Sequence, residues 1–470
     1  MMRTPIVMGC LLALSACASL APDYQRPEAP IPAAWPAGAA YAQQDATQST
    51  AADVPWRDFI VDERLRQVVA QALAHNRDLR AALANVEAAR AQYRVQHAGE
   101  LPTVEASVAS SRARARVSGA ARDSTTTVIG ESASASIGLS SFEIDLFGKA
   151  RSLSEAALQS ALASEASARS TRITVIGETA SAWLTLASDA EQLRVARQTM
   201  DSAERSMAVT RQRQALGVSS AVDVHQAETV YQQARVDVAS LTTSLAQARN
   251  ALQLLTGGPV ADALLPDGLP ADAAWLAEVP AGVSSSVLLQ RPDVLQAEHQ
   301  LQSANANIGA ARAALFPSLE LTASGGLGSA ALSTLFSGGA TVWSIAPSLS
   351  LPIFDGGARR ATVAYDEAQR DAYVAQYEQA VQTAFKETAD ALARRGTIRE
   401  QVDAQAALVA AAERSYQLAD ARYRLGADTY LNALDAQRTL YSARMTLAST
   451  RLTLLDNRVT LYRVLGGGAL

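Results

Sequence analysis

Apolar residues recur at alternating spacings of three and four positions along much of the chain. One run extends from Tyr231 to Leu255, and an equivalent run extends from Leu440 to Val464. This heptad pattern is typical of helices that pack as coiled coils, whether in a filament or in a helical barrel. Upstream of the first run, residues 149–215 contain no Pro and a single Gly, Gly177. At 1.5 Å per residue this stretch predicts a helix about 100 Å long.

The same pattern gives the bounds of the helices that we expect. Long helices are predicted over 149–215 and 357–424, and return helices over 220–256 and 429–465. Leu216-Gly217 and Leu425-Gly426 fall at the points where the chain must reverse. Glycine is the usual residue for a left-handed turn at the end of a helix.

A different period appears before each long helix. Ala133, Ala135, Ile137 and Leu139 alternate with polar or small residues, and a similar alternation extends from Trp343 to Leu351. Together with weaker alternation ahead of each, this predicts four strands, at about 103–117, 131–142, 318–328 and 340–351. Each is near the length of about ten residues that crosses a bilayer at a tilt. A small soluble antiparallel sheet shows the same alternation.

Four strands are too few to close a transmembrane barrel, and an open sheet edge is not tolerated in lipid. A membrane-embedded sheet of this kind therefore requires several copies of the chain. Two copies supply eight strands and three supply twelve. Only the larger ring is wide enough to leave a lumen that is not filled by side chains, which favours three copies.

The chain also repeats itself. Asn76-Arg77-Asp78 to Leu101-Pro102 matches Arg291-Pro292-Asp293 to Phe316-Pro317 at an offset of 215 positions, and Leu216-Gly217 matches Leu425-Gly426 at an offset of 209. We therefore predict two repeats, 62–257 and 284–470, joined by a connection at 258–283. The expected fold is mostly α, with four β-strands and long coiled-coil helices in each protomer.

The N-terminus carries a short apolar stretch after Arg3, followed by Leu14-Ser15-Ala16-Cys17. This pattern is typical of a lipoprotein signal peptide over 1–16, with lipid attached to Cys17 and an extended lipidated segment over 17–61. No Asp follows Cys17, which favours sorting to the outer membrane. A plain cleaved signal with an incidental Cys is the alternative. Cys10 leaves with the signal, so no disulfide is expected.

Composition narrows the class further. The chain is 49% hydrophobic but only 5% aromatic, which favours closely packed Ala-rich helices over a bulky globular core. The net charge is −5 without blocks of like charge, so a nucleic-acid partner is not expected.

Several motifs together resemble the TolC/OprM-type outer-membrane factors, and most closely the lipoprotein branch of RND efflux systems, the NodT family. They include Leu288-Leu289-Gln290-Arg291-Pro292-Asp293-Val294, Phe142-Glu143-Ile144-Asp145-Leu146-Phe147-Gly148-Lys149, Pro352-Ile353-Phe354-Asp355-Gly356-Gly357 and Leu434-Asp435-Ala436-Gln437-Arg438. Phe142 departs from the family, in which Trp is common.

The resemblance implies a homotrimer in the outer membrane with a twelve-stranded barrel and a periplasmic α-barrel. It also implies a periplasmic adaptor protein and an inner-membrane RND-type pump as partners. The protein would be a passive exit duct for small molecules such as antibiotics, without a catalytic residue, a cofactor or a metal.

The resemblance also points to site residues at the helix reversals. Adaptor hairpins meet such channels at the periplasmic tips. The corresponding docking candidates are Arg213, Leu216, Gly217, Val218, Arg422, Leu425, Gly426 and Ala427. Turn glycines without a partner are the alternative.

Leu431 and Asp435 match the family's gate positions. They lie four residues apart and hence on one face of a helix. In a trimer they would form an apolar ring and a carboxylate ring that narrow the periplasmic mouth. The alternative is that Asp435 caps the helix or forms a local ion pair, for example with Arg438 or Arg422.

Arg112, Arg114 and Arg116 share the strand face of Val104, Ala106 and Val108. If that face looks outward, the arginines emerge beyond the hydrocarbon layer, where the guanidinium fork suits lipopolysaccharide phosphates. A solvated extracellular loop is the alternative.

Three other functions remain open from the residues. They are a duct for type I protein secretion, a heavy-metal efflux duct, and a periplasmic coiled-coil scaffold lipoprotein that is not a channel. The Gly-rich segment Gly325-Gly326-Leu327-Gly328 lacks the Lys-Ser/Thr of a phosphate-binding loop and is expected in a hairpin loop.

Overall fold

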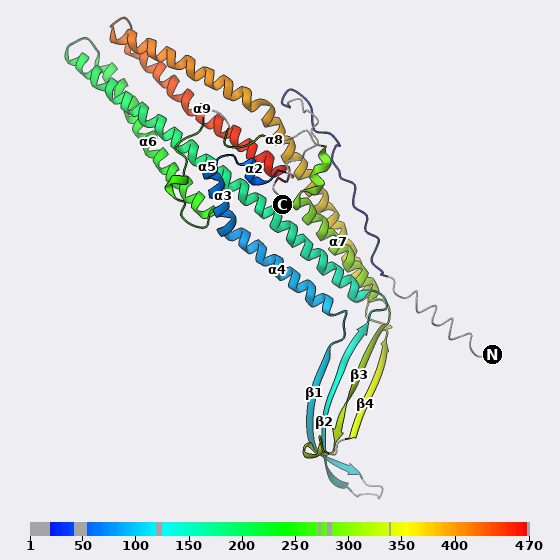
Figure 1. Cartoon of the computed structure of the whole chain (residues 1–470). Helices are drawn as coiled ribbons and strands as arrows, with labels where there is room; N and C mark the ends of the chain where they lie inside the picture. The colour runs from blue at the N-terminus through cyan, green and yellow to red at the C-terminus, as the bar shows by residue number, and fades with distance from the viewer. Residues whose placement is uncertain are drawn as a thin grey trace. The chain divides into compact units, whose positions relative to one another are not determined.

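The computed structural model describes residues 19–41, 54–118, 125–270, 274–279, 284–337 and 340–467 (Figure 1). The chain divides into two compact units. The sheet unit comprises the N-terminal residues up to Pro27 with Glu87–Ala163 and Glu298–Gln376. The hairpin unit comprises Glu28–Val86, Ser164–Ala297 and Tyr377–Leu470. Four of the helices contribute residues to both units, because their bounds span the divisions.

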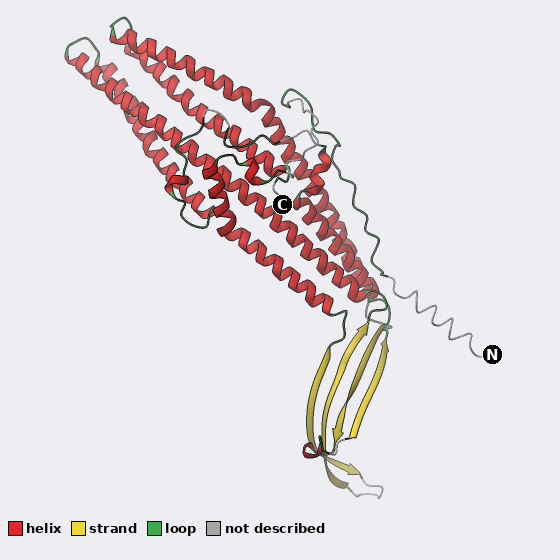
Figure 2. Cartoon of the chain, viewed as in Figure 1, coloured by secondary structure: helices red, strands yellow, loops and turns green. Residues whose placement is uncertain are grey.

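Four antiparallel strands form the sheet, in the order β1-β2-β3-β4 (Figure 2). They are β1 (Val104–Ser118), β2 (Thr125–Ile144), β3 (Ser318–Ser329) and β4 (Ala340–Ser350). The expectation of four strands is confirmed. β2 begins at Thr125 and not near 131, because Thr127, Val128 and Ile129 are strong strand formers although they do not alternate in polarity.

The Gly-rich segment Gly325–Gly328 lies within β3, so its expected place in a hairpin loop was wrong. The reason is close approach between strands. A Cβ atom on Gly326 would lie 2.1 Å from the carbonyl oxygen of Ala135 on β2. The glycine is therefore needed where the two backbones meet.

One face of the sheet is apolar across all four strands. The register places Val104 opposite Leu139, Leu139 opposite Ala323, and Ala323 opposite Ile345. The other face carries hydroxyl pairs between neighbouring strands, which are Ser107–Ser136 at 3.1 Å, Ser111–Ser132 at 2.9 Å and Ser324–Ser344 at 3.0 Å. The sheet thus has one apolar and one polar side, as the alternation predicts.

A β-bulge preserves this arrangement near the end of β2. The pairing shifts between Leu139 and Phe142, and Ser141 has a φ of 50°. Without the extra residue, Phe142 would point to the polar face, because side chains alternate along a strand. With it, Phe142 lies opposite Leu321 on the apolar side.

The two repeats have matching helices. α4 (Arg77–Ala98) and α7 (Pro292–Ala313) begin and end 215 positions apart. α5 (Lys149–Ala215) and α8 (Ala358–Arg424), like α6 (Ala221–Leu255) and α9 (Tyr430–Val464), lie 209 positions apart. The remaining helical segments are α2 (Trp56–Phe59), α3 (Glu63–His75), η2 (Asp262–Leu264), η3 (Ser285–Gln290) and η4 (Leu332–Thr334).

Within the described ranges, no helix combines the length and apolar character needed to cross a membrane.

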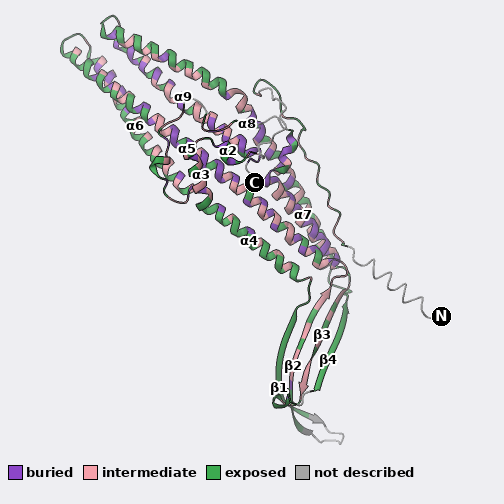
Figure 3. Cartoon of the chain, in the orientation of Figure 1, coloured by how far each residue is buried: buried purple, intermediate pink, exposed green. Residues whose placement is uncertain are grey.

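The heptad runs are buried to different degrees. In α9, Leu440, Ala443 and Leu447 are buried, whereas of their equivalents in α6 only Ala234 is buried, and Tyr231 and Val238 are half-buried in a single chain (Figure 3). A buried arginine also stabilises the hairpin unit. The Arg291 guanidinium donates to the Val464 carbonyl at 2.9 Å and pairs with Asp293 and Glu387. Burial lowers the pKa of Arg291, but the two carboxylates outweigh it and raise the pKa above its usual value.

Candidate functional site

Two helical hairpins of the hairpin unit end in nearly identical turns, one between α5 and α6 and one between α8 and α9 (Figure 1). Gly217 has a φ of +75° and Gly426 a φ of +74°. The N–H of the residue after each glycine donates to the carbonyl oxygen five residues back, at 2.9 Å in both turns. These are Schellman motifs, in which glycine avoids the strain of a left-handed residue.

The two turns differ in how the following helix begins. Ser220 and Asp223 form a capping box at the start of α6, in which the Ser220 hydroxyl accepts from the Asp223 N–H at 3.1 Å. Burial raises the pKa of Asp223, but hydrogen bonds from Ser219 and Ser220 and the charge of Arg213 outweigh it and hold the pKa below its usual value.

At the start of α9, Thr429 makes no side-chain cap. The preceding residue, Asp428, instead binds groups on both sides of the turn. Its carboxylate accepts from the Thr429 N–H at 2.8 Å, from the Asn432 amide at 2.6 Å and from Arg422 Nε at 3.2 Å. The Thr429 N–H, the Asn432 amide and Arg422 hold the pKa of Asp428 below its usual value.

Apolar side chains project from both turns. Leu216 is 79% exposed and Leu425 is 84% exposed, and Val218 and Val222 are also largely exposed. Large apolar residues exposed together at a turn are uncommon on a monomeric surface and are typical of interaction sites. Gly217, Gly426 and Ala427 provide the backbone of this surface.

Arg213 does not project from the turn as Leu216, Val218 and Leu425 do. Its guanidinium donates to the Tyr423 carbonyl at 3.1 Å and lies 4.7 Å from the centre of the Tyr423 ring. Such a cation–π contact joins the end of α5 to the end of α8. Arg422 is likewise engaged, with Asp428. Arg213 therefore joins the two hairpins, and Arg422 holds its own turn in place.

A row of hydroxyl contacts joins the two hairpins behind the turns, and we call it the tyrosine seam. Its pairs are Tyr416–Ser202 at 3.2 Å, Tyr430–Ser206 at 3.4 Å and Tyr423–Thr210 at 3.2 Å. An apolar cluster that includes Ala203, Met207 and Leu434 surrounds it. Sequence reasoning missed the seam, although its tyrosines recur every seven positions and its hydroxyl residues every four.

A further contact lies deeper between the hairpins. The Tyr441 hydroxyl donates to Asp237 at 2.9 Å, which joins α9 to α6. Burial raises the pKa of Tyr441, and the hydrogen bond to Asp237 and the charge of that carboxylate raise it further. This phenol therefore stays protonated at neutral pH and remains a donor.

The two gate candidates share an exposed face at the start of α9. Leu431 is 46% exposed and Asp435 is exposed, whereas Ala433 and Leu434 between them are buried. Across the described residues, the Asp435 carboxylate forms no ion pair, and Arg422 pairs with Asp428 instead. The alternative of a local ion pair for Asp435 is therefore not what the structure has.

The three arginines considered for lipid contact lie on β1, within the paired sheet. Arg112, Arg114 and Arg116 are opposite Glu131, Ile129 and Thr127 of β2. Arg112 forms an ion pair with Glu131 at 2.9 Å, and 71% of its side chain remains exposed. They are therefore strand residues and not loop residues.

Cys17, the expected lipid site, lies outside the described residues. The segment that follows it is held firmly in the sheet unit. The Arg26 guanidinium makes two hydrogen bonds to Glu298 of α7, and the Asn305 amide donates to the Pro22 carbonyl at 2.7 Å. A Cβ on Gly309 would lie 2.7 Å from the Ala21 side chain, so this glycine makes room for the segment.

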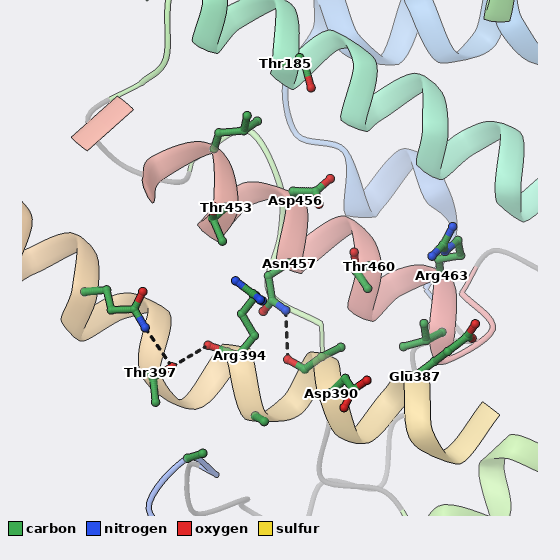
Figure 4. A pocket seen from close by; sticks show the side chains of 16 residues that line it. Thr185, Glu387, Asp390, Arg394, Thr397, Thr453, Asp456, Asn457, Thr460 and Arg463 are labelled. Atoms are coloured by element: carbon green, nitrogen blue, oxygen red, sulfur yellow. Dashed lines mark hydrogen bonds between the residues drawn. The ribbon is translucent and has the colours of Figure 1, made fainter. Parts of the chain in front are cut away.

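A polar cavity of about 990 Å³ lies among α5, α8 and α9 of the hairpin unit (Figure 4). Its charged lining includes Glu387, Asp390, Arg394, Asp456 and Arg463. The Asn457 amide donates to the Ala391 carbonyl at 3.0 Å at its wall. Among the described residues, no group of three His, Cys, Asp or Glu side chains is placed to hold a metal ion.

Known proteins share this arrangement. The model of the outer membrane efflux protein family matches residues 68–258 and 283–467, one stretch in each repeat. TtgC of Pseudomonas putida, a probable efflux pump outer membrane protein, is 45% identical over 411 residues, which cover 87% of this chain and 84% of that protein.

Solved structures of similar proteins have the same fold. A membrane protein from Pseudomonas aeruginosa matches with a TM-score of 0.87 and 39% identity, over 96% of this chain and 100% of that one. The open state of the MtrE outer membrane channel of Neisseria gonorrhoeae matches with a TM-score of 0.85 and 36% identity, over 96% of this chain and 99% of that one. The chain therefore belongs to the outer membrane efflux protein family.

Proposed function

We propose that the protein is the outer-membrane channel of a tripartite efflux pump and serves as a passive exit duct for small molecules such as antibiotics. It works as a homotrimer with a periplasmic adaptor protein and an inner-membrane RND-type pump. The single observation that carries this proposal is the four-stranded sheet with one apolar face and two unpaired edges, in a chain of this family.

The sheet supports the trimer through its edges. Among the residues that the structure describes, β1 and β4 each pair with a single strand of their own chain. Unpaired backbone N–H and C=O groups cost several kcal/mol each in hydrocarbon, so a membrane sheet must close on itself. Three copies provide twelve strands, and a ring of that size leaves a lumen. The apolar face then contacts outer-membrane lipid and the serine-rich face lines the lumen.

The periplasmic gate is proposed at Leu431 and Asp435. Both side chains are exposed in one protomer and lie on one face of α9. Three copies of each would give an apolar constriction and, one turn away, a ring of carboxylates. The tyrosine seam supports the gate mechanically, since it holds the α8/α9 hairpin that carries these residues against α5.

The adaptor is proposed to dock on the two turns. The exposed Leu216, Val218 and Leu425 supply apolar contact area, and Gly217 and Gly426 let a partner approach the backbone. Arg422 and Ala427 support the second turn from within its hairpin, and Arg213 supports both turns by its contact with Tyr423 of the other hairpin.

At the other end, Cys17 is proposed to carry the lipid anchor after removal of residues 1–16, with 17–61 as the lipidated segment. The repeats 62–257 and 284–470 follow, with the connection 258–283 between them. The contacts of Arg26 with Glu298 support a fixed tether, because they hold the chain a few residues after Cys17.

Arg112, Arg114 and Arg116 are proposed to contact lipopolysaccharide phosphates at the outer end of β1. The expected result is that lipopolysaccharide raises the thermal stability of the native trimer, and that replacing all three with Gln removes that effect. An equal effect of lipopolysaccharide on both proteins would end this assignment.

The exit-duct function is tested in a deletion strain that is challenged with antibiotics, dyes and metals. We expect increased susceptibility to several small molecules, which the wild-type chain restores. Restoration should fail for a variant with Leu216 and Leu425 replaced by Asp, although that variant still reaches the outer membrane as a trimer. Unchanged susceptibility of the deletion strain across the panel would contradict the function.

A further inference from the structure

Each carboxylate that lines the polar cavity of about 990 Å³ has a donor of its own. Glu387 accepts a hydrogen bond from Arg291 at 2.9 Å, and Asp390 accepts one from Lys386 at 2.8 Å. Asp456 accepts from a serine hydroxyl of α5. The negative groups of the cavity are therefore already engaged with donors on its walls.

Two guanidinium groups of the same cavity, those of Arg394 on α8 and Arg463 on α9, are not engaged in this way. Across the described part of the chain, neither has an ion-pair or hydrogen-bond partner. Figure 4 shows Arg394 extending from α8 toward α9 and away from Asp390. The Arg463 side chain lies beside α5, because a Cβ atom on Gly177 would be 3.6 Å from its Cδ atom. The cavity thus contains two guanidinium groups whose donors are available to a ligand.

The cavity lies on the face of α9 that carries the gate candidate Asp435. Asp435, Ser442, Ser449, Asp456 and Arg463 follow one another at intervals of seven, and none of them is buried. Residues seven apart share a face of a helix that packs as a coiled coil. At 1.5 Å per residue, the cavity residues of α9 are about 30–40 Å from Asp435 along the helix.

The connection between the repeats covers the other side of α8 and α9 at the same level. Arg458 donates to the Leu276 carbonyl at 2.7 Å and to Glu278 at 3.0 Å, and Arg395 of α8 donates to the same connection at 3.0 Å. Two residues are about 200° apart around a helix, so Arg458 points away from Asp456. In a trimer whose gate face looks toward the axis, the cavity therefore opens into the duct.

We propose that this cavity is an anion site on the wall of the duct, at which Arg394 and Arg463 bind carboxylate or phosphate groups of solutes in transit. The guanidinium group offers two parallel donors that match both kinds of anion. The inference rests on the proposed exit-duct function, and it adds a class of solute, namely small molecules that carry an acidic group. Three copies of the chain provide six such guanidinium groups.

The anion site acts separately from the gate. A ring of Asp435 carboxylates repels anions at the mouth, but the Debye length at physiological ionic strength is about 8 Å, far shorter than the separation along α9. The gate charge therefore does not cancel the attraction of Arg394 and Arg463. Both arginines are exposed, so water competes for their donors and bound solutes are released again, as transport requires.

Block of the single-channel current tests the anion site in the native trimer. Channels in planar bilayers are titrated with citrate and, separately, with inorganic tripolyphosphate. The test variants are Arg394→Gln, Arg463→Gln and the two combined. The matched control is Arg399→Gln, which removes the same charge from α8 but lies within electrostatic reach of Arg458, on the side of the connection. Arg394→Lys keeps the charge at its position.

We expect at least one of the two anions to block the wild-type current. The combined variant should raise the half-blocking concentration about tenfold, which corresponds to the loss of one charge-assisted hydrogen bond. Each single Gln variant should raise it by a smaller factor, Arg394→Lys should retain most of the block, and Arg399→Gln should match the wild type. Block by citrate identifies a carboxylate as the bound group, and block by tripolyphosphate identifies a phosphate.

Trimer content is measured separately, by migration of unheated protein in detergent. If the combined variant does not assemble, the single variants are judged by the same criterion. Conducting channels that neither anion blocks, or whose block changes equally in Arg394→Gln and Arg399→Gln, overturn the anion site and leave the channel function standing. A native trimer that conducts no ions overturns both.

Discussion

The tyrosine seam gives a prediction about the gate whose size follows from the structure. Tyr423→Phe removes one hydroxyl from a buried contact and leaves the ring in place. The Thr210 hydroxyl donates to the Ser206 carbonyl at 2.9 Å, so the Tyr423 hydroxyl is the donor to Thr210 at 3.2 Å. Such a hydrogen bond contributes about 1 kcal/mol. Its loss weakens the contact between the α8/α9 hairpin and α5.

The effect on the opening equilibrium depends on the trimer, because all three hairpins carry the substitution. If the seam forms only in the closed channel and the three hairpins move together, the closed state loses about 3 kcal/mol, which corresponds to a shift of up to about 150-fold in the opening equilibrium. If they move independently, each shifts by about fivefold. We therefore expect Tyr423→Phe to raise the open probability of single channels in planar bilayers, and the size of the change distinguishes the two modes.

A matched control separates gating from stability. The Tyr462 hydroxyl donates to the Val54 carbonyl at 3.0 Å, away from the seam. Tyr462→Phe should therefore cost a similar free energy of unfolding and leave the open probability unchanged. The reasoning is refuted if both variants change the open probability equally, or if Tyr423→Phe leaves it at the wild-type value.

Three further outcomes are expected. Leu431→Ala combined with Asp435→Ala should raise ion leak in planar bilayers, and unchanged conductance and open probability would rule out these residues as the gate. Asp223→Asn should lower thermal stability at neutral pH. Because the pKa of Asp223 is depressed in the folded protein, that difference should shrink as the pH falls below about 3.9 and through the folded value; a constant difference would contradict the capping role. Arg291→Met removes a buried guanidinium from Asp293 and Glu387, whose side chains are 39% and 40% exposed, and leaves the Val464 carbonyl without its donor. It should cost about 1–3 kcal/mol in unfolding by denaturant, whereas a loss below about 0.5 kcal/mol would contradict a stabilising role of this cluster.

The long elements could be predicted from sequence because each has a single dominant period. The run from Leu440 to Val464 keeps its heptad throughout α9, and the alternation from Ala133 to Leu139 marks the middle of β2. The start of β2 could not be predicted, since Thr127, Val128 and Ile129 are consecutive strand formers without alternation. The close approach of two strand backbones, as at Gly326, also leaves no periodic signal in the sequence.

The candidate site was predictable only in part, for a related reason. The turn glycines can be recognised in the sequence because they interrupt a helical pattern. The roles of the neighbouring side chains cannot, because they depend on a partner helix far away in sequence. Arg213 is an example, because its contact with Tyr423 joins residues 210 positions apart. The tyrosine seam has regular spacing, yet the same spacing suits any buried helix face.

Conductance of the purified trimer tests the account most directly. Protein that migrates as a trimer without heating and as a monomer after heating is reconstituted into planar bilayers, with the Tyr423→Phe variant in parallel. The account predicts discrete channel openings whose probability rises in the variant. A stable trimer that conducts no ions in either form would contradict a channel and would favour a periplasmic scaffold.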